Sequence, residues 1–328
     1  MISYSAPRWL VGGHSQTIAS ARLAPRPRVQ YYRQRWQTPD HDFIDLDFTE
    51  PESTHHQYQN LWVLFHGLEG CSRSHYSVSM MHYVKQIGAL GVVVHFRGCS
   101  GDQNLTPRAY HSGDSAELNW LLPLLRQKLA FIQNCQVIGI SLGGNVLLKW
   151  LGELGSQAQQ WVDCAVSISA PINLAAGAQH MASGFSRVYT QHFLRTLIPK
   201  ALDKIRRFPG LGEPEKIKVC NNFIEFDNLV TAPWHGFSDA YDYYQKSSAL
   251  QYLPGIAVPT LLVHAHNDPF LPGSYLPNSA QLPAVVQCLY PQTGGHVGFV
   301  QARGFRLNLE WMPTVCGHFF LAQRACYV

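Results

Sequence analysis

Short runs of hydrophobic residues recur along the chain, and most are rich in β-branched side chains. The segment "FIDLDF" at 43–48 alternates between hydrophobic and polar residues, which is typical of a strand. The later runs are continuous: "LWVLFHG" (61–67), "GVVVHF" (91–96), "CQVIGIS" (135–141), "CAVSIS" (164–169), "PTLLVHA" (259–265) and "AVVQCLY" (284–290). Continuous runs of this length predict strands buried on both faces, as the strands of parallel sheets are.

Segments of helix length with hydrophobic residues at helical spacing lie between these runs. They cover Tyr76–Ala89, Asp114–Leu129, Gly144–Leu154 and about Leu307–Gln323. Strands that alternate with helices predict the α/β class, with a mostly parallel, doubly wound central sheet flanked by helices.

The alternation stops between residues 172 and 250. This segment contains no clear buried strand, and it includes the amphipathic stretch "FSRVYTQHFLRTLIPKALDKIRRF" at 185–208. The sheet pattern resumes at 259–265. We therefore predict one domain over 1–328, with a helical cap at 172–250 inserted before that strand.

The amphipathic stretch has one apolar face and a set of basic residues elsewhere. The apolar face is formed by Phe185, Val188, Leu194, Leu197, Ile198, Leu202 and Ile205. The basic residues are Arg195, Lys200, Lys204, Arg206 and Arg207. One interpretation is a cap helix that packs its apolar face on the core and leaves its charges in solvent. The other is a basic face that makes peripheral contact with anionic lipid surfaces.

Composition narrows the class of protein. The 328 residues are 46% hydrophobic, enough for a sizeable core, and the formal net charge is +4, from 25 basic and 21 acidic residues. The charges are dispersed, so we predict no nucleic-acid partner. No signal-peptide pattern and no membrane-spanning apolar run occur. Eight cysteines lack any C-x-x-C pair and predict reduced, packed thiols in a cytoplasmic protein: Cys71, Cys99, Cys135, Cys164, Cys220, Cys288, Cys316 and Cys326.

A serine follows the predicted strand at 135–141 and precedes a predicted helix. Gly139, Ser141 and Gly143 form the pattern G-x-S-x-G in the strand–turn–helix context of a nucleophile elbow. The glycines allow close packing at a sharp turn, and the helix that follows directs its positive end toward the serine. A serine that only caps the helix is the structural alternative.

Partners for a serine nucleophile occur downstream in the order that this elbow requires. Asp268 follows the strand at 259–265, and His296 lies in the loop after the next strand. We predict that His296 acts as the general base for Ser141 and that Asp268 orients the imidazole. A turn-forming Asp before Pro269 and a hydrogen-bonded loop histidine are the structural alternatives.

An acyl-transfer site also needs backbone donors for an oxyanion. The loop "FHGLEG" follows the strand at 61–67, and we assign the N–H groups of Leu68 and Leu142 to this role. His66 and Gly67 are candidate supports of the same loop, or simply part of a turn.

The motifs resemble the α/β-hydrolase superfamily, in the branch of bacterial YheT-type hydrolases, plant EMB8-like proteins and animal ABHD1/ABHD2/ABHD3-type lipases. The resemblance covers about Pro7 to Phe320. It is carried by "PRWLVGGHSQTI", "FHGLEG", "HFRGCSG" (95–101), "YHSGDSAEL" (110–118), "GISLGGN", "FDNLVTAPWHGF" (226–237) and "GGHVGF".

This resemblance implies a cofactor-independent serine esterase or lipase (EC 3.1.1.-) that acts on a small-molecule ester or a lipid. It also implies that Ser141, Asp268 and His296 form the catalytic triad, with the backbone N–H groups of Leu68 and Leu142 as the oxyanion donors. The animal relatives have a membrane anchor, for which this sequence shows no candidate. Arg97 in "HFRGCSG" follows a strand, and we expect it to pair with a carboxylate that braces the loops rather than to bind a substrate acid or phosphate.

The residues alone are also compatible with three other functions. An acyltransferase would use the same triad and a different acceptor. A metal-dependent hydrolase could be built on His264, His266 and Asp268, although no further ligand pair lies nearby in the sequence. A non-catalytic binding module could keep the fold without the chemistry.

Overall fold

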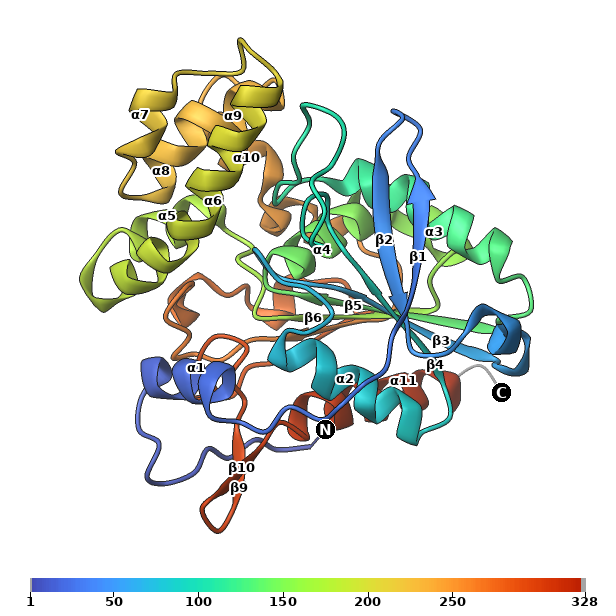
Figure 1. The fold of residues 1–328 in the computed structure, drawn as a ribbon. Coiled ribbons are helices and arrows are strands. Elements are labelled where there is room, and N and C mark those ends of the chain that lie inside the picture. The colour runs from blue at the N-terminus through green and yellow to red at the C-terminus, as the bar shows by residue number, and fades with distance from the viewer. Residues whose placement is uncertain (1, 326–328) are drawn as a thin grey trace.

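An eight-stranded sheet forms the centre of the molecule in the computed structural model, which describes residues 2–325 (Figure 1). The strand order is β1-β2-β4-β3-β5-β6-β7-β8. The strands are β1 (Tyr32–Gln37), β2 (Phe43–Phe48), β3 (Asn60–Phe65), β4 (Leu90–Val94), β5 (Asn134–Ile140), β6 (Cys164–Ile168), β7 (Thr260–Val263) and β8 (Val286–Leu289). Strands β3 to β8 run parallel, whereas β1 and β2 are antiparallel additions at one edge. The predicted fold class is thereby confirmed.

Helices cover both faces of the sheet, which explains the continuous hydrophobic runs. Helices α3 (Ser115–Lys128) and α4 (Leu142–Leu154) pack on one face, and α2 (His75–Gln86) and α11 (Trp311–Ala325) on the other. Successive residues of β3 divide between the two cores: Val63 belongs to the first, and Leu64 to the second. Because side chains alternate across a strand, a strand buried on both faces needs a hydrophobic residue at every position.

The segment between β6 and β7 is helical and lies at one end of the sheet (Figure 1). It contains α5 (Leu174–Met181), α6 (Arg187–Arg207), α7 (Pro214–Lys218), α8 (Phe223–Phe226), the π-helical turn η4 (Asp227–Thr231), α9 (Ala232–Trp234) and α10 (Ala240–Ser247). Part of it forms a hydrophobic cluster of its own, around Leu194 and Ile217. We call residues 172–250 the cap segment.

Short 3₁₀ helices connect several of these elements. They are η1 (Glu52–Gln57), η2 (Gly155–Gln160), η3 (Gly184–Ser186), η5 (Ala249–Gly255), η6 (Gly273–Tyr275) and η7 (Ser279–Gln281). Within residues 2–325, no helix combines the length and the apolar character that crossing a bilayer requires.

Three local elements differ from the sequence-based expectation. The pattern did not predict α1 (Gly13–Arg22) or β1, because α1 buries polar residues such as Gln16 and Thr17 and β1 is polar at most positions. The helix expected from about Leu307 begins at Trp311 instead. Residues before it form the hairpin of β9 (Gln301–Arg303) and β10 (Arg306–Asn308), which turns at Gly304 with φ +63°.

The basic residues of α6 are not all on a solvent face, which corrects one expectation. Lys204 is buried and donates hydrogen bonds to Asn104 Oδ1 and to two backbone carbonyls of the same loop. Lys200 pairs with Glu69 at 2.8 Å. These ammonium groups satisfy loop acceptors beneath the helix, so they are not available to a lipid surface.

The cysteines of the described residues form no disulfide bond with one another. They are Cys71, Cys99, Cys135, Cys164, Cys220, Cys288 and Cys316, whereas Cys326 lies outside the described residues. Burial raises the pKa of Cys99 and of Cys135 to about 12, so both side chains are neutral packing groups.

Candidate active site

Ser141 sits in a strained backbone conformation between β5 and α4. Its φ is +52° and its ψ is −118°, which few non-glycine residues adopt. The flanking glycines are required by close approach: a Cβ at Gly143 would lie 2.5 Å from the Phe65 carbonyl oxygen, and one at Gly139 would lie 2.6 Å from the Gly143 oxygen. The turn therefore has the geometry of a nucleophile elbow, in which the side chain is forced outward.

The three residues predicted to form a triad lie within hydrogen-bonding distance. His296 Nε2 is 2.9 Å from Ser141 Oγ, and His296 Nδ1 is 2.9 Å from Asp268 Oδ2. Asp268 follows β7 and His296 follows β8, so three strand ends of the parallel sheet supply the set. The arrangement is the serine–imidazole–carboxylate relay that general-base activation of a serine needs.

Asp268 is buried and held ionised by its surroundings. Burial alone would raise the pKa of its carboxyl group, but His296 and His264, together with hydrogen bonds, keep that pKa below its ordinary value. One of the hydrogen bonds comes from the Phe270 N–H at 2.7 Å. A buried carboxylate in this state can orient an imidazole and stabilise its protonated form.

Helix α1 fixes the loop that carries His296, a support that the sequence pattern did not reveal. The His296 N–H donates to Thr17 Oγ1 at 2.8 Å, and the Gly294 N–H donates to Gln16 Oε1 at 2.8 Å. The Gln16 oxygen also accepts from Asn267 Nδ2, next to Asp268. The buried polar residues of α1 thus tie together the loops that carry Asp268 and His296.

His66 and Gly67 shape the loop beside the serine. His66 is fully buried: its Nε2 accepts from the Phe96 N–H at 3.1 Å, so its Nδ1 carries the hydrogen and donates to the Gly67 oxygen at 2.7 Å. Burial lowers the pKa of His66 to about 3, which keeps the ring neutral. A Cβ at Gly67 would lie 3.1 Å from Ser141 Cβ, a tight contact that glycine avoids beside the serine.

Arg97 pairs with three carboxylates, which leaves it no donor for a substrate acid. Its Nε donates to Glu117 at 2.6 Å, its Nη1 to Asp40 at 2.7 Å and Asp42 at 3.2 Å, and its Nη2 to Asp40 and Glu117. All five guanidinium N–H donors are therefore used. The sequence offered no sign of these partners, because Asp40 and Asp42 precede Arg97 by more than fifty residues.

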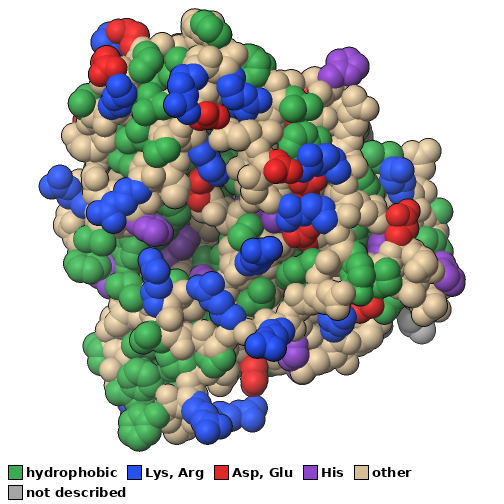
Figure 2. All heavy atoms as spheres, in the orientation of Figure 1, with side chains coloured by type: hydrophobic (Ala, Val, Ile, Leu, Met, Phe, Trp, Pro, Cys, Tyr) green, Lys and Arg blue, Asp and Glu red, His purple; other side chains and the backbone are tan. Residues whose placement is uncertain are grey.

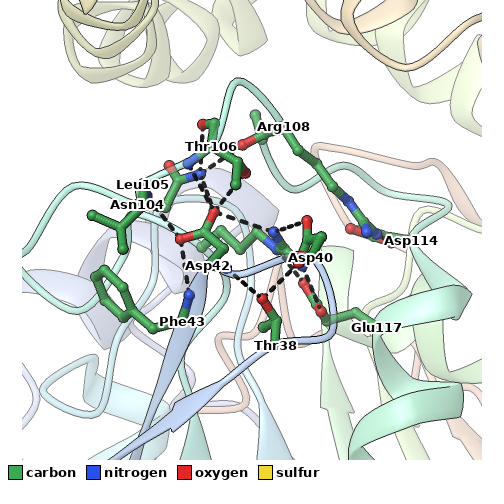
Figure 3. A network of polar contacts seen from close by, with 12 residues as sticks. Thr38, Asp40, Asp42, Phe43, Asn104, Leu105, Thr106, Arg108, Asp114 and Glu117 are labelled. Atoms are coloured by element: carbon green, nitrogen blue, oxygen red, sulfur yellow. Dashed lines mark hydrogen bonds and ion pairs between the residues drawn. The ribbon is translucent and has the colours of Figure 1, made fainter.

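The carboxylates around Arg97 also hold the loop that follows it. Figure 3 shows Asp40, Asp42 and Glu117 converging on one cluster of polar contacts. Asp42 accepts from the Leu105 N–H at 2.7 Å and from Thr106 Oγ1 at 2.7 Å. Hydrogen bonds from Arg97 lower the pKa of Asp40 to about 2. This ionised network anchors the loop over 98–108, part of which lines the cavity described next.

A cavity of about 200 Å³ opens onto Ser141 between the sheet and the cap segment. Leu68 and Leu142, the predicted oxyanion donors, line it beside the serine. The cap segment contributes mainly hydrophobic side chains to the lining, among them Leu174, Met181, Phe193, Leu197, Phe226 and Val230. A mostly apolar cavity with a few polar groups near a nucleophile is typical of a site for a partly apolar small molecule.

Two of the three residues weighed as metal ligands, His264 and Asp268, are engaged in other contacts. Among the described residues, no group of three or more His, Cys, Asp or Glu side chains is arranged to hold a metal ion. His264 Nε2 is 3.0 Å from the Leu271 carbonyl oxygen, and Asp268 is shared with His296.

Comparison with known proteins agrees with the fold. The family described as alpha/beta hydrolase fold matches residues 61–302, which is most of the chain. The chain belongs to the α/β-hydrolase family. Solved structures agree in fold: the esterase Pf2001 of Pyrococcus furiosus has a TM-score of 0.58 at 14% identity, over 97% of this chain and 99% of that one.

Within this family the chain belongs to the YheT/ABHD branch. It is 39% identical to the putative esterase YheT of Escherichia coli, over 88% of this chain and 84% of that protein. It is 26% identical to human phospholipase ABHD3, over 91% of this chain and 74% of that protein. A monoacylglycerol lipase of Saccharomyces cerevisiae is also 26% identical, but the chain spans only 63% of its length. The α/β hydrolase described here thus has relatives named as esterases and lipases.

Proposed function

We propose that this α/β hydrolase cleaves carboxylic esters through an acyl-serine intermediate at Ser141. The observation that carries the proposal is the unbroken chain of contacts from Ser141 Oγ through His296 to Asp268, at the foot of an apolar cavity. An isolated helix-capping serine would need neither the imidazole nor the buried carboxylate behind it.

The proposed reaction has two halves. His296 Nε2 takes the proton of Ser141 as the serine oxygen attacks the ester carbonyl carbon, and the N–H groups of Leu68 and Leu142 stabilise the oxyanion. The proton then passes to the alcohol oxygen, which leaves. Water repeats the sequence on the acyl-enzyme, releasing the acid and restoring Ser141. Because these steps use only groups of the chain and water, they call for no cofactor.

The substrate class follows from the cavity and is supported by the relatives. The hydrophobic lining contributed by the cap segment suits an acyl chain, and relatives are named as a phospholipase and a monoacylglycerol lipase. We infer a small-molecule ester or lipid with an apolar acyl group as substrate. The described cysteines form no disulfide bond, which supports a reducing location, for which we propose the cytoplasm.

The proposal is tested by turnover and by labelling. We expect the purified protein to hydrolyse a series of p-nitrophenyl esters, with a monoacylglycerol and a phospholipid as further substrates, and an organophosphonate to label Ser141. In Ser141→Ala, we expect labelling to be lost and turnover to fall by roughly three orders of magnitude or more while the fold is kept. A protein that turns over no acyl ester and is not labelled would instead be a binding module.

Two controls separate the remaining alternatives. Added alcohols that compete with water identify an acyltransferase, because the ester of the added alcohol then becomes the main product. Treatment with a chelator leaves the proposed enzyme active. Loss of activity that returns with zinc would contradict the serine mechanism and favour the set of His264, His266 and Asp268.

A further inference from the structure

Helix α1 and the β9–β10 hairpin share a buried core and expose hydrophobic side chains around it. Leu10, Ala19 and Ala24 pack with Val300, Leu307 and Leu309 in one cluster. Outside this cluster, residues in and next to α1 and a residue at the hairpin turn expose large hydrophobic side chains. These are Trp9 (50% exposed), Val11 (80%), Ile18 (41%), Leu23 (67%) and Phe305 (90%). Phe305 at the hairpin turn is almost fully exposed and Trp9 is half exposed, so this surface is suited to an apolar partner.

The same surface is strongly basic. Its exposed arginines are Arg8, Arg22, Arg26, Arg303 and Arg306, of which Arg303 forms an ion pair with Glu310 at 3.1 Å. The chain contains no acidic residue before Asp40. Figure 2 shows basic and hydrophobic side chains side by side at the lower left, where Figure 1 places α1 and the hairpin. We call these exposed hydrophobic and arginine side chains the α1–hairpin patch.

We propose that the α1–hairpin patch docks on an anionic lipid surface. Binding to a membrane interface has two contributions. Exposed aromatic and aliphatic side chains enter the headgroup region, and the arginines around them attract anionic headgroups. A second copy of this chain fits less well, because a symmetric dimer would face the basic patch with itself and repel. Charge complementarity therefore selects lipid over self-association.

The patch lies next to the elements that build the active site. His14 of α1 contacts Phe185 of η3 and Tyr189 of α6 at ring-centroid distances of 4.7 and 5.7 Å, and α6 lines the cavity. Phe185 and Val188 extend the exposed hydrophobic surface onto η3 and the start of α6, at 52% and 55% exposure. Docking at the patch would thus hold the α6 side of the cap segment near lipid. The docking itself does not rest on the proposed ester hydrolysis.

Vesicle co-sedimentation tests the proposal without any turnover. Diether lipids are used because they contain no ester for the protein to cleave. We expect binding to vesicles of phosphatidylcholine with phosphatidylglycerol, little binding to phosphatidylcholine alone, and release by added salt. Trp9→Ser with Phe305→Ser, and separately Arg22→Gln with Arg306→Gln, should each lower the partition coefficient roughly ten-fold.

Control substitutions outside the α1–hairpin patch test whether vesicle binding depends on the patch itself. Val219→Ser with Tyr241→Ser removes exposed hydrophobic side chains of the cap segment, and Arg206→Gln removes an exposed charge there. These variants should bind as the unmodified protein does. Equal binding to neutral and anionic vesicles, or no effect of the patch variants, would overturn the proposal. A dimer in light scattering that Trp9→Ser with Phe305→Ser dissociates, without vesicle binding, would assign the patch to self-association.

Discussion

The Phe270 ring lies parallel to the His296 imidazole, with ring centroids 3.8 Å apart and an interplanar angle of 8°. Two neutral rings gain little from such a face-to-face arrangement. A protonated imidazole gains more, since the ring face of Phe270 carries negative charge density. The stack therefore favours the imidazolium that the proposed mechanism creates when His296 takes the serine proton. Tyr189 and Phe193 of α6 pack against Phe270 and hold it in place.

Phe270→Leu should slow the chemical step. Loss of a cation–π contact of about 1 kcal/mol predicts a kcat lowered roughly five-fold. Phe270→Tyr keeps the ring face and should retain most of kcat. Because Phe270 also lines the cavity, Leu197→Ala is the control: it changes the lining at a residue outside the Phe270–His296 stack and should alter KM more than kcat. Steady-state kinetics on one ester decide the matter, and equal losses in Phe270→Leu and Phe270→Tyr would contradict a role for the stack.

Asp268→Asn tests the orienting carboxylate. The amide oxygen can still accept from the Phe270 N–H, so we expect the loop to keep its conformation. The amide cannot stabilise the imidazolium or hold the required tautomer, and kcat should fall by roughly 10⁴-fold. Near-ultraviolet circular dichroism checks the fold while ester hydrolysis gives the rate. Turnover close to that of the unmodified protein would show that Asp268 is only a turn residue.

Arg97→Gln should destabilise the protein strongly. It leaves Asp40, Asp42 and Glu117 near one another without their cation, and breaking a buried ion pair typically costs about 3–5 kcal/mol. Arg97→Lys should also be destabilising, since an ammonium cannot supply five directed donors. Urea unfolding measures the effect. The control Arg206→Gln removes an exposed pair with Asp203 and should change the free energy of unfolding by less than about 1 kcal/mol.

The ion-pair network around Arg97 should also make the free energy of unfolding depend on acidic pH. The pKa of Asp40 is about 2 in the folded protein, against an ordinary value of 3.8, so the folded form binds fewer protons in this range. The stabilisation by the ionised carboxylate is complete above about pH 4 and is lost as the pH falls toward about 2. Arg97→Gln should lack this part of the acid dependence. An unchanged acid dependence in that variant would show that Arg97 does not hold Asp40 ionised.

The strands, the elbow and its partners could be predicted because each is associated with a local sequence pattern. A strand buried on both faces must be hydrophobic throughout, and the positions of Ser141, Asp268 and His296 after successive strand ends follow from the parallel sheet. Contacts made by tertiary packing have no such local sequence pattern. Gln16 and Thr17 look like ordinary polar helix residues until α1 is seen to hold the His296 loop. Likewise, the helical pattern of α6 gave no sign that Lys200 and Lys204 bind loops beneath it.

Asp227 lies in the π-helical turn η4 and should give the cap segment a distinct pH dependence. Its carboxyl group accepts hydrogen bonds from Thr231 Oγ1 and Tyr244 Oη, at 2.5 and 2.7 Å. Burial nevertheless raises its pKa to about 6. Between about pH 4 and pH 6 the folded form therefore binds more protons than the unfolded form, and the contribution of Asp227 to stability falls as the pH rises.

Asp227→Asn removes this titration and keeps an oxygen acceptor for its partners. The free energy of unfolding of the variant, relative to the unmodified protein, should rise from about pH 4 to about pH 6 and stay constant above. Urea unfolding of both proteins across this range gives the difference between their free energies of unfolding. Burial also raises the pKa of Asp114 to about 6, but this residue titrates alike in both proteins, so its contribution cancels in the difference. Asp242 is a suitable control, since a hydrogen bond from Lys246 lowers its pKa and Asp242→Asn should give a flat difference above about pH 4. A flat difference for Asp227→Asn as well would mean that Asp227 is already ionised throughout this range.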